Sequence, residues 1–130
     1  MTALDVERGV GKAKRKALFG ATLREKRLAR KISLRKLAEM IGVSSTYLSQ
    51  VEQDRYDPPT VDRVTKIAEI FDEDPDEWIG LANRVPDDVD TIVKEHPKEI
   101  PELLRAARGL SPEQFARLQQ TIKRMKAKGD

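Results

Sequence analysis

The sequence predicts an all-α protein in which a small helical domain is followed by a short helical tail. Aromatic residues are few, with three Phe, two Tyr and one Trp among 130 residues, whereas residues that favour helices are abundant. Apolar residues recur at spacings of three and four, which marks one face of a helix. Ser and Gly stand at the positions where these stripes begin and end. A chain of this length forms one domain, or one small domain with an appendage.

Three segments are predicted along the chain. Residues 1–18 contain the stretch GVGKAKRK, in which glycines and cations predominate, and we expect a flexible basic arm. Residues 19–83 form the domain, and residues 84–130 form the tail. The domain begins with a helix from Phe19 to Arg30. Four of its residues lie on related faces: Phe19, Leu23, Arg27 and Leu28.

Residues 33–53 predict two short helices joined by a tight turn. The first helix has a stripe at spacings of 3, 1 and 3, formed by Leu34, Leu37, Ala38 and Ile41. Ser33 can cap this helix, which ends at Gly42, and Ser44 can cap the second. Two short helices joined by a turn that contains Gly are the signature of the DNA-binding helix-turn-helix. The alternative is an ordinary helical hairpin with a polar solvent face.

The second of these helices has its own apolar stripe, formed by Tyr47, Leu48 and Val51. With both stripes facing inward, short uncharged polar side chains face outward: Ser45, Thr46, Ser49, Gln50 and Gln53. Such side chains can donate and accept hydrogen bonds, as recognition of base edges requires.

A loop, DRYDPPT, and two further helices complete the predicted domain. Thr60 or its neighbour caps the fourth helix, whose apolar stripe consists of Val61, Val64, Ile67, Ala68 and Phe71. Pro75 suits the first turn of the fifth helix. Three residues then close the core: Trp78, Ile79 and Leu81.

The tail is predicted to contain three helices. Val89, Ile92 and Val93 indicate a sixth helix before Pro97, and a seventh helix ends at Gly109. Ser111 and Pro112 begin a last helix with a heptad-like apolar seam. A tail this short cannot stabilise a domain by itself, so it must cover its seam on the first domain or on a second copy. We expect a homodimer with contacts at Leu104, Phe115, Leu118, Ile122 and Met125.

Much of the domain resembles the Cro/repressor-type helix-turn-helix of the xenobiotic response element (XRE) family. The resemblance covers residues 19–82 and runs through LREKR (23–27), SLRKLAEMIGVSSTYLSQVE (33–52), DPPT (57–60) and VTKIAEIFDEDPDEW (64–78). It implies a five-helix domain that inserts its third helix into the major groove, usually as a dimer on a two-fold operator.

The resemblance also implies roles for individual residues. Base contacts are implied at Ser45, Thr46 and Gln50, and Ser49 is expected beside them. Phosphate contacts are expected from the start of the second helix and from Arg35, Lys36, Tyr47 and Arg55. A structural ion pair is implied between Arg27 and Glu52. Two positions depart from the family pattern: Asp54 replaces a usual Gly, and Leu34 replaces a phosphate-orienting Gln.

The charges are distributed unevenly along the chain. The stretch from Arg8 to Lys36 contains twelve Lys or Arg residues and a single acid, Glu25. The stretch from Asp72 to Glu102 contains eleven acids and three cations. This division predicts that the basic end meets a polyanion. The arm of residues 1–18 can follow phosphates or the minor groove, or it can be a disordered leader.

Other functions are predicted less well by the sequence. The chain has no cysteine and a single histidine, His96, so we expect no catalytic site, metal or cofactor. No apolar stretch suggests a signal peptide or membrane span, which predicts a cytoplasmic, nucleoid-associated protein. One alternative is an antitoxin-like or adaptor protein whose tail binds a partner while DNA binding serves autoregulation.

A second, shorter resemblance concerns the tail. The stretch HPKEIPELLRAARGLSPEQFARLQQTIKRM is similar to tails of regulators encoded beside ImmA/IrrE-type zinc metallopeptidases. It implies a repressor that is relieved when a partner peptidase cuts it within or near the dimerising region. From the chain as a whole we expect a homodimeric repressor that controls its own operon. The segment from Leu103 to Ser111 is the expected target.

Overall fold

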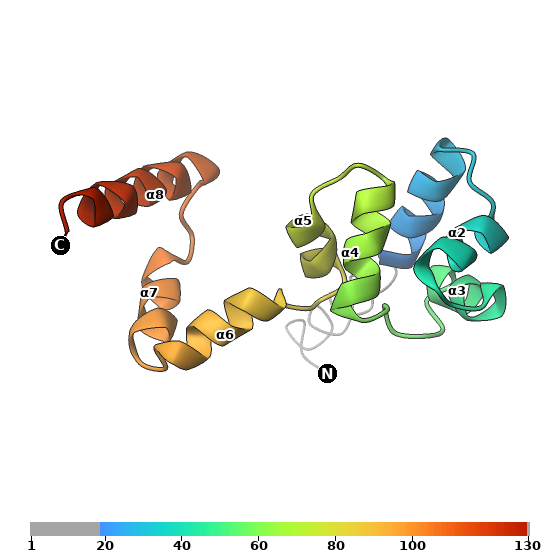
Figure 1. Ribbon diagram of the computed structural model, residues 1–130, viewed down its shortest axis with the longest axis horizontal. Helices are drawn as coiled ribbons and strands as arrows, with labels where there is room; N and C mark the ends of the chain where they lie inside the picture. Colours follow the sequence, from blue (N-terminus) through green and yellow to red (C-terminus); the bar gives the residue numbers. More distant parts are fainter. Residues whose placement is uncertain (1–18, 130) are drawn as a thin grey trace, which may run out of the picture. The chain divides into compact units, whose positions relative to one another are not determined.

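The computed structural model describes residues 19–129, and every regular element in that part of the chain is a helix (Figure 1). Residues 19–29 are helical and are followed by α2 (Leu34–Ile41), α3 (Ser45–Glu52), α4 (Val61–Ile70), α5 (Pro75–Leu81), α6 (Asp87–Glu95), α7 (Glu99–Ala107) and α8 (Pro112–Ala127). The predicted all-α fold is confirmed. The predicted arm at residues 1–18 lies outside the described residues. None of the described helices combines the length and apolar character needed to cross a membrane.

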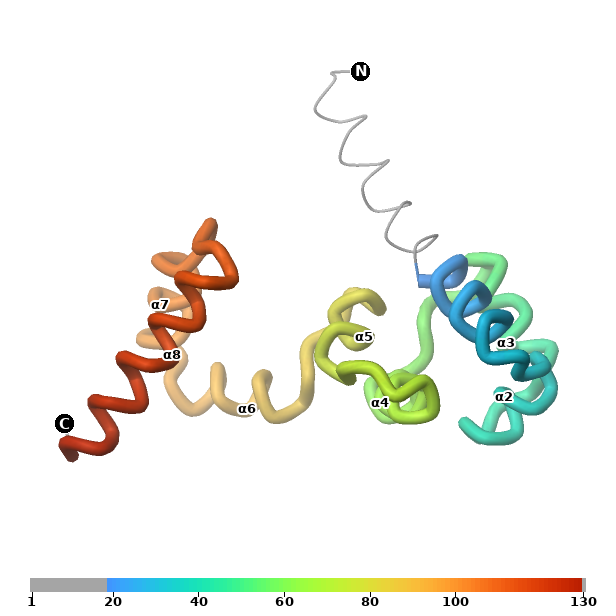
Figure 2. Tube along the Cα trace, turned by 90° about the horizontal axis from the view of Figure 1, so that it is seen from above, coloured from blue at the N-terminus to red at the C-terminus, as the bar shows by residue number. Residues whose placement is uncertain are grey.

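The chain forms two compact units that divide between Asp87 and Asp88, four residues after the boundary predicted from the sequence. In the first unit, α2 contacts both α3 and α4, and α4 lies beside α5 (Figure 2). The buried core draws on all five helical segments and contains Phe19, Leu23, Leu37, Ala38, Ile41, Leu48, Val51, Val64, Ile67, Ala68, Phe71, Trp78, Ile79 and Ala82. Of the four residues predicted to lie on related faces of the first helix, Leu28 is 54% exposed, whereas Phe19, Leu23 and Arg27 are buried.

Local sequence signals determine where α2 and α3 begin. The Ser33 hydroxyl accepts the Lys36 amide N–H at 3.0 Å, and the Ser44 hydroxyl accepts the Tyr47 amide N–H at 3.0 Å. Gly42 ends α2 with φ 77°, a left-handed conformation that costs glycine little. These predicted caps leave a three-residue connection between the two helices. Thr60 occupies the cap position of α4, although its side chain makes no capping bond.

A nearly buried ion pair fixes α3 to the first helical segment. Arg27 donates through Nε to Glu52 Oε2 at 2.7 Å and through Nη2 to Glu52 Oε1 at 2.9 Å. Its Nη1 also donates to the Ile32 carbonyl at 3.0 Å. Hydrogen bonding to Glu52 raises the pKa of Arg27, against the opposing effect of burial. The two side chains are only 9% and 6% exposed, so each depends on the other for its counter-charge.

Glu73 forms a second connection, between the first helical segment and the turn after α4. Its carboxylate accepts from Lys26 Nζ at 2.7 Å, Trp78 Nε1 at 2.7 Å and Arg30 Nη2 at 3.1 Å. The hydrogen bond from Lys26, followed by the one from Trp78, lowers the pKa of Glu73. Arg30 also lies over the Phe71 ring, 4.7 Å from its centroid. These contacts give Trp78 a structural role as a core residue with a satisfied indole N–H.

We predict that Glu52→Leu will lower the free energy of unfolding by about 3–5 kcal/mol, because Arg27 would then lack its counter-charge. Urea denaturation followed by circular dichroism measures the change. The double variant Arg27→Met/Glu52→Leu should recover most of the loss, and Glu39→Leu on the exposed face of α2 serves as the control. Equal stability of Glu52→Leu and the wild type would show that the pair is not needed to hold α3.

Candidate nucleic-acid interface

The outward face of α3 is the first part of the candidate interface. Leu48 and Val51 are fully buried, so the helix cannot turn about its axis without opening the core. Ser45 and Thr46 are therefore exposed, and Ser49 and Gln50 are half-buried beside them. Gln53 Nε2 donates to the Ser49 hydroxyl at 2.9 Å, which leaves the Ser49 O–H proton available for another acceptor. This face offers several hydrogen-bonding groups and no fixed charge.

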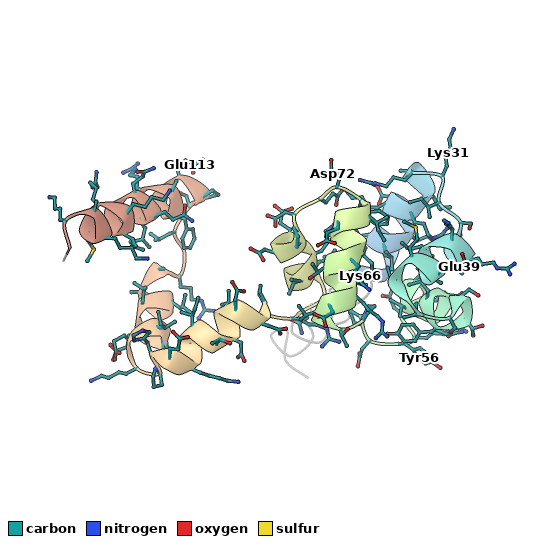
Figure 3. The ribbon with its side chains drawn as sticks, in the orientation of Figure 1. Lys31, Glu39, Tyr56, Lys66, Asp72 and Glu113 are labelled. Carbon is teal, nitrogen blue, oxygen red and sulfur yellow. The ribbon has the colours of Figure 1, made fainter. Side chains whose placement is uncertain are left out.

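The segment between α3 and α4 forms the second part. Tyr47 on α3 and Tyr56 in the loop have ring centroids 5.9 Å apart at an interplanar angle of 36°. Figure 3 shows Tyr56 at the outer edge of the first unit, below α3 and α4 in this view. A hollow beside the two rings is lined by Tyr47, Arg55, Tyr56, Asp57, Pro58, Pro59, Thr60, Arg63 and Arg84. Three arginines, Arg55, Arg63 and Arg84, therefore line one hollow together with the carboxylate residue Asp57. Arginine side chains suit phosphate oxygens as partners.

Arg84 holds this loop in place from outside it. Its Nη2 donates to the Pro58 carbonyl at 2.6 Å, and its Nε donates to the Pro59 carbonyl at 2.7 Å. The donor lies 26 and 25 residues away from these acceptors in the sequence, just after α5. Arg84 thus connects the end of the first unit to the loop that carries Arg55 and Tyr56.

The other end of the same loop is anchored at Asp54. This residue has φ 60°, the left-handed conformation expected where Asp replaces Gly. Its carboxylate accepts the Gly20 N–H, and its pKa is raised by burial, partly offset by that hydrogen bond. A Cβ on Gly20 would lie 2.7 Å from the Val51 carbonyl oxygen and 2.8 Å from that of Glu52. The first helical segment and the end of α3 therefore approach too closely for any larger residue at position 20.

The start of α2 contributes two exposed cations. Arg35 Nε lies 3.9 Å from Glu39 Oε1, and both side chains are largely exposed, so the contact constrains Arg35 little. Lys36 has an exposed side chain, while its amide is used by the Ser33 cap. Leu34 packs against the core, which explains how an apolar residue is accommodated where the family has a polar one.

Sequence reasoning named Arg55 and Tyr47 but missed Arg63 and Arg84. Arg63 lies in the first turn of α4, and Arg84 lies beyond α5, so neither adjoins the predicted motif. A search for cations at the N-terminus of α4 would have found Arg63. No local pattern marks Arg84, because its role depends on contacts between distant segments.

The residues expected at a dimer contact belong to the second unit. Leu104, Phe115, Ile122 and Met125 are all exposed in the single chain, and Leu118 is half-buried. Within residues 19–129, therefore, none of these side chains is buried in a core. Among the described residues, no group of three His, Cys, Asp or Glu side chains could hold a metal ion.

Comparisons with known proteins give a match within the first unit and similar solved structures. Residues 23–78 match the protein-family model described as helix-turn-helix. Similar solved structures include the clp gene regulator ClgR from Corynebacterium glutamicum, with 22% identity, a TM-score of 0.45 and coverage of 74% of this chain and 95% of that chain. The SinR protein/SinI protein complex has 24% identity, a TM-score of 0.43 and coverage of 84% and 98%. These sequence identities and TM-scores are too low to support a conclusion about function. No curated protein matches the chain.

We predict that Arg84→Ala will loosen the α3–α4 loop, because the Pro58 and Pro59 carbonyls would lose their charged donor. Amide hydrogen exchange in residues 54–60 should become about tenfold faster or more. Arg63→Ala is the matched control, since it removes a guanidinium from the same hollow without removing either bond. Unchanged exchange in Arg84→Ala would show that the loop is held by other contacts.

Proposed function

We propose that this chain, whose residues 23–78 match a helix-turn-helix family model, is a DNA-binding protein of the XRE type and a sequence-specific transcriptional repressor that acts as a homodimer on a two-fold operator. The observation that carries this proposal is the outward face of α3. Uncharged hydrogen-bonding side chains lie on a helix fixed by Leu48 and Val51, and cations precede and follow it along the chain. Recognition of base edges requires uncharged hydrogen-bonding side chains, and binding of phosphates requires cations.

We assign base recognition to Ser45, Thr46, Ser49 and Gln50. Gln50 has the longest side chain of the four and, as an amide, can make a bidentate contact with adenine. Phosphate contacts are assigned to Arg35, Lys36, Tyr47 and Arg55, together with free amide groups at the start of α2. The hollow extends the phosphate surface to Arg63.

Homodimerisation accounts for the exposed apolar side chains of the second unit. One short recognition helix contacts few base pairs, so a second half-site adds both affinity and specificity. When two domains are joined, the second one binds as an intramolecular event, and affinity rises without new contacts. We further propose that the protein represses its own operon in the cytoplasm.

Relief of repression is assigned to cleavage of the tail by a partner peptidase. The connection between α7 and α8 consists of residues 108–111, which are not helical, and Gly109 there has φ 90°. Arg108 and Gly109 are exposed, as a protease requires of its substrate backbone. Cleavage at this connection would separate α8 from the rest of the chain and thereby weaken the dimer.

We predict different effects of two substitutions on DNA binding. Gln50→Ala should weaken the preferred operator by about 1–3 kcal/mol and leave binding to random DNA nearly unchanged. Arg55→Ala should weaken binding to the operator and to random DNA alike. It should also reduce the slope of log K against log salt concentration by about one. Titrations of operator and random duplexes at several salt concentrations separate these cases. If Gln50→Ala lowered the affinity for both duplexes equally, base recognition could not be assigned to α3.

A single cut in the connection of residues 108–111 should release the operator. We predict that a site for a specific protease placed there will, after cleavage, lower operator affinity about 100-fold or more, because the two half-sites are no longer bound by one molecule. The same site added after residue 129 is the control. Coexpression with a neighbouring metallopeptidase, followed by mass spectrometry, tests whether cleavage occurs in cells. Operator release by intact protein bound to a partner would favour the adaptor function instead.

A further inference from the structure

Four polar residues of α3 form a stripe on the side of the helix that faces away from the core. They follow one another at spacings of 3, 1 and 3, and they are Thr46, Ser49, Gln50 and Gln53. Residues at these spacings lie on one face of a helix. Ser49 and Gln53 are four residues apart, so their side chains are neighbours on that face.

A hydrogen bond between these two neighbours has a defined direction. Gln53 Nε2 donates to the Ser49 hydroxyl oxygen at 2.9 Å. A hydroxyl has one proton to donate, and here its oxygen already accepts. Accepting a hydrogen bond makes an O–H group a stronger donor, because bonds in a chain polarise one another. If Ser49 accepted a second bond from a base, its own proton would be left unpaired where water is excluded, which is unfavourable.

The proton of Ser49 is not used by the helix itself. Ser and Thr hydroxyls in helices often donate to the carbonyl four residues earlier. Thr65 does so to the Val61 carbonyl at 2.8 Å, and Thr121 does so to the Arg117 carbonyl at 3.1 Å. Ser49 forms no such bond within the part of the chain that the structure describes. Its O–H group is therefore available to an acceptor outside α3.

The backbone at Gln53 is held firmly enough to position a side chain. The Gln53 amide N–H donates to the Ser49 carbonyl at 3.1 Å. On one side of it, Glu52 accepts two hydrogen bonds from Arg27, at 2.7 and 2.9 Å. On the other side, the Asp54 carboxylate accepts the Gly20 N–H. A side chain on such a supported backbone can orient its neighbour without much ordering when DNA binds.

The direction of this bond has a consequence for base recognition. In the major groove, guanine, adenine and thymine each present at least one acceptor, whereas cytosine presents only the N4 amine, a donor. We propose that Gln53 is a positioning residue that makes the Ser49 hydroxyl a donor toward DNA, so that the operator excludes cytosine from the position facing Ser49. The proposal rests on the base recognition of the proposed function and specifies its chemistry at one position of each half-site.

Selection of operators from random duplex DNA by the full-length protein tests the proposal. Ser49→Ala identifies the position, because the base preference should change there and be kept elsewhere. At that position the wild type should disfavour cytosine about fivefold or more. Gln53→Met keeps the side-chain length but has no donor, so this bias should fall to about twofold or less. Gln120→Met makes the same substitution at an exposed residue of α8 and should keep the wild-type preference.

A second variant reverses the direction of the bond. The carboxylate of Gln53→Glu only accepts, so the Ser49 O–H should donate to it and turn the oxygen lone pairs toward the base. Cytosine should then become the preferred base at the same position, by about threefold or more. Overall affinity should fall, because the added negative charge lies near phosphates. The decisive measurement is therefore the preference among bases for each variant.

The double variant Ser49→Ala/Gln53→Glu separates action through Ser49 from direct contact. It should lose the preference for cytosine, since no hydroxyl remains to be oriented. A double variant that still selects cytosine would show that the carboxylate contacts the base itself, which overturns the positioning role. Circular dichroism verifies that every variant keeps its helices.

The remaining outcomes divide between the two proposals. Exclusion of cytosine by Gln53→Met as strong as in the wild type would overturn the role of Gln53, and so would a Ser49→Ala variant with an unchanged operator. A wild-type protein that enriches no sequence at all would instead overturn the base recognition of the proposed function.

Discussion

The position of α3 depends on the ion pair between Arg27 and Glu52 and on the core residues beside it. Leu48 and Val51 fix the rotation of the helix, and Glu52 fixes its end to the first helical segment through two short hydrogen bonds. A buried charge without its partner is costly, so the pair favours one arrangement of these segments over alternatives in which they separate. The polar face of α3 is thereby presented as a rigid surface, with little ordering left to occur when DNA binds.

Much of this domain could be predicted because its signals are local. Ser33, Gly42 and Ser44 act within a few residues of themselves, and the apolar stripes follow from helical periodicity. The loop could be predicted only in part. Asp54 adopts the expected left-handed conformation, but the bonds from Arg84 and the close approach at Gly20 depend on segments far apart in the sequence. Periodicity grouped Leu28 with Phe19, Leu23 and Arg27 on related faces, but Leu28 alone of the four is exposed to solvent.

The two units differ in how they obtain stability. The first unit encloses a core of apolar side chains and satisfies its buried charge, as a self-sufficient domain does. In the second unit, helix caps such as the reciprocal Ser111–Gln114 pair determine where helices begin, but apolar faces remain at the surface. The sequence could predict these helices from caps and stripes. It could not predict which surfaces cover the apolar faces, because such contacts depend on segments distant from these helices rather than on local signals.

Selection from a pool of random duplex DNA, followed by sequencing, tests the central claim most directly, because one experiment reports specificity, symmetry and spacing. A homodimer that recognises bases through α3 should enrich a single motif with two inverted half-sites whose centres lie about 10 base pairs apart, or a multiple of that distance. Recovery of an asymmetric single half-site would contradict dimeric binding. Recovery of no preferred sequence at all would contradict base recognition by α3.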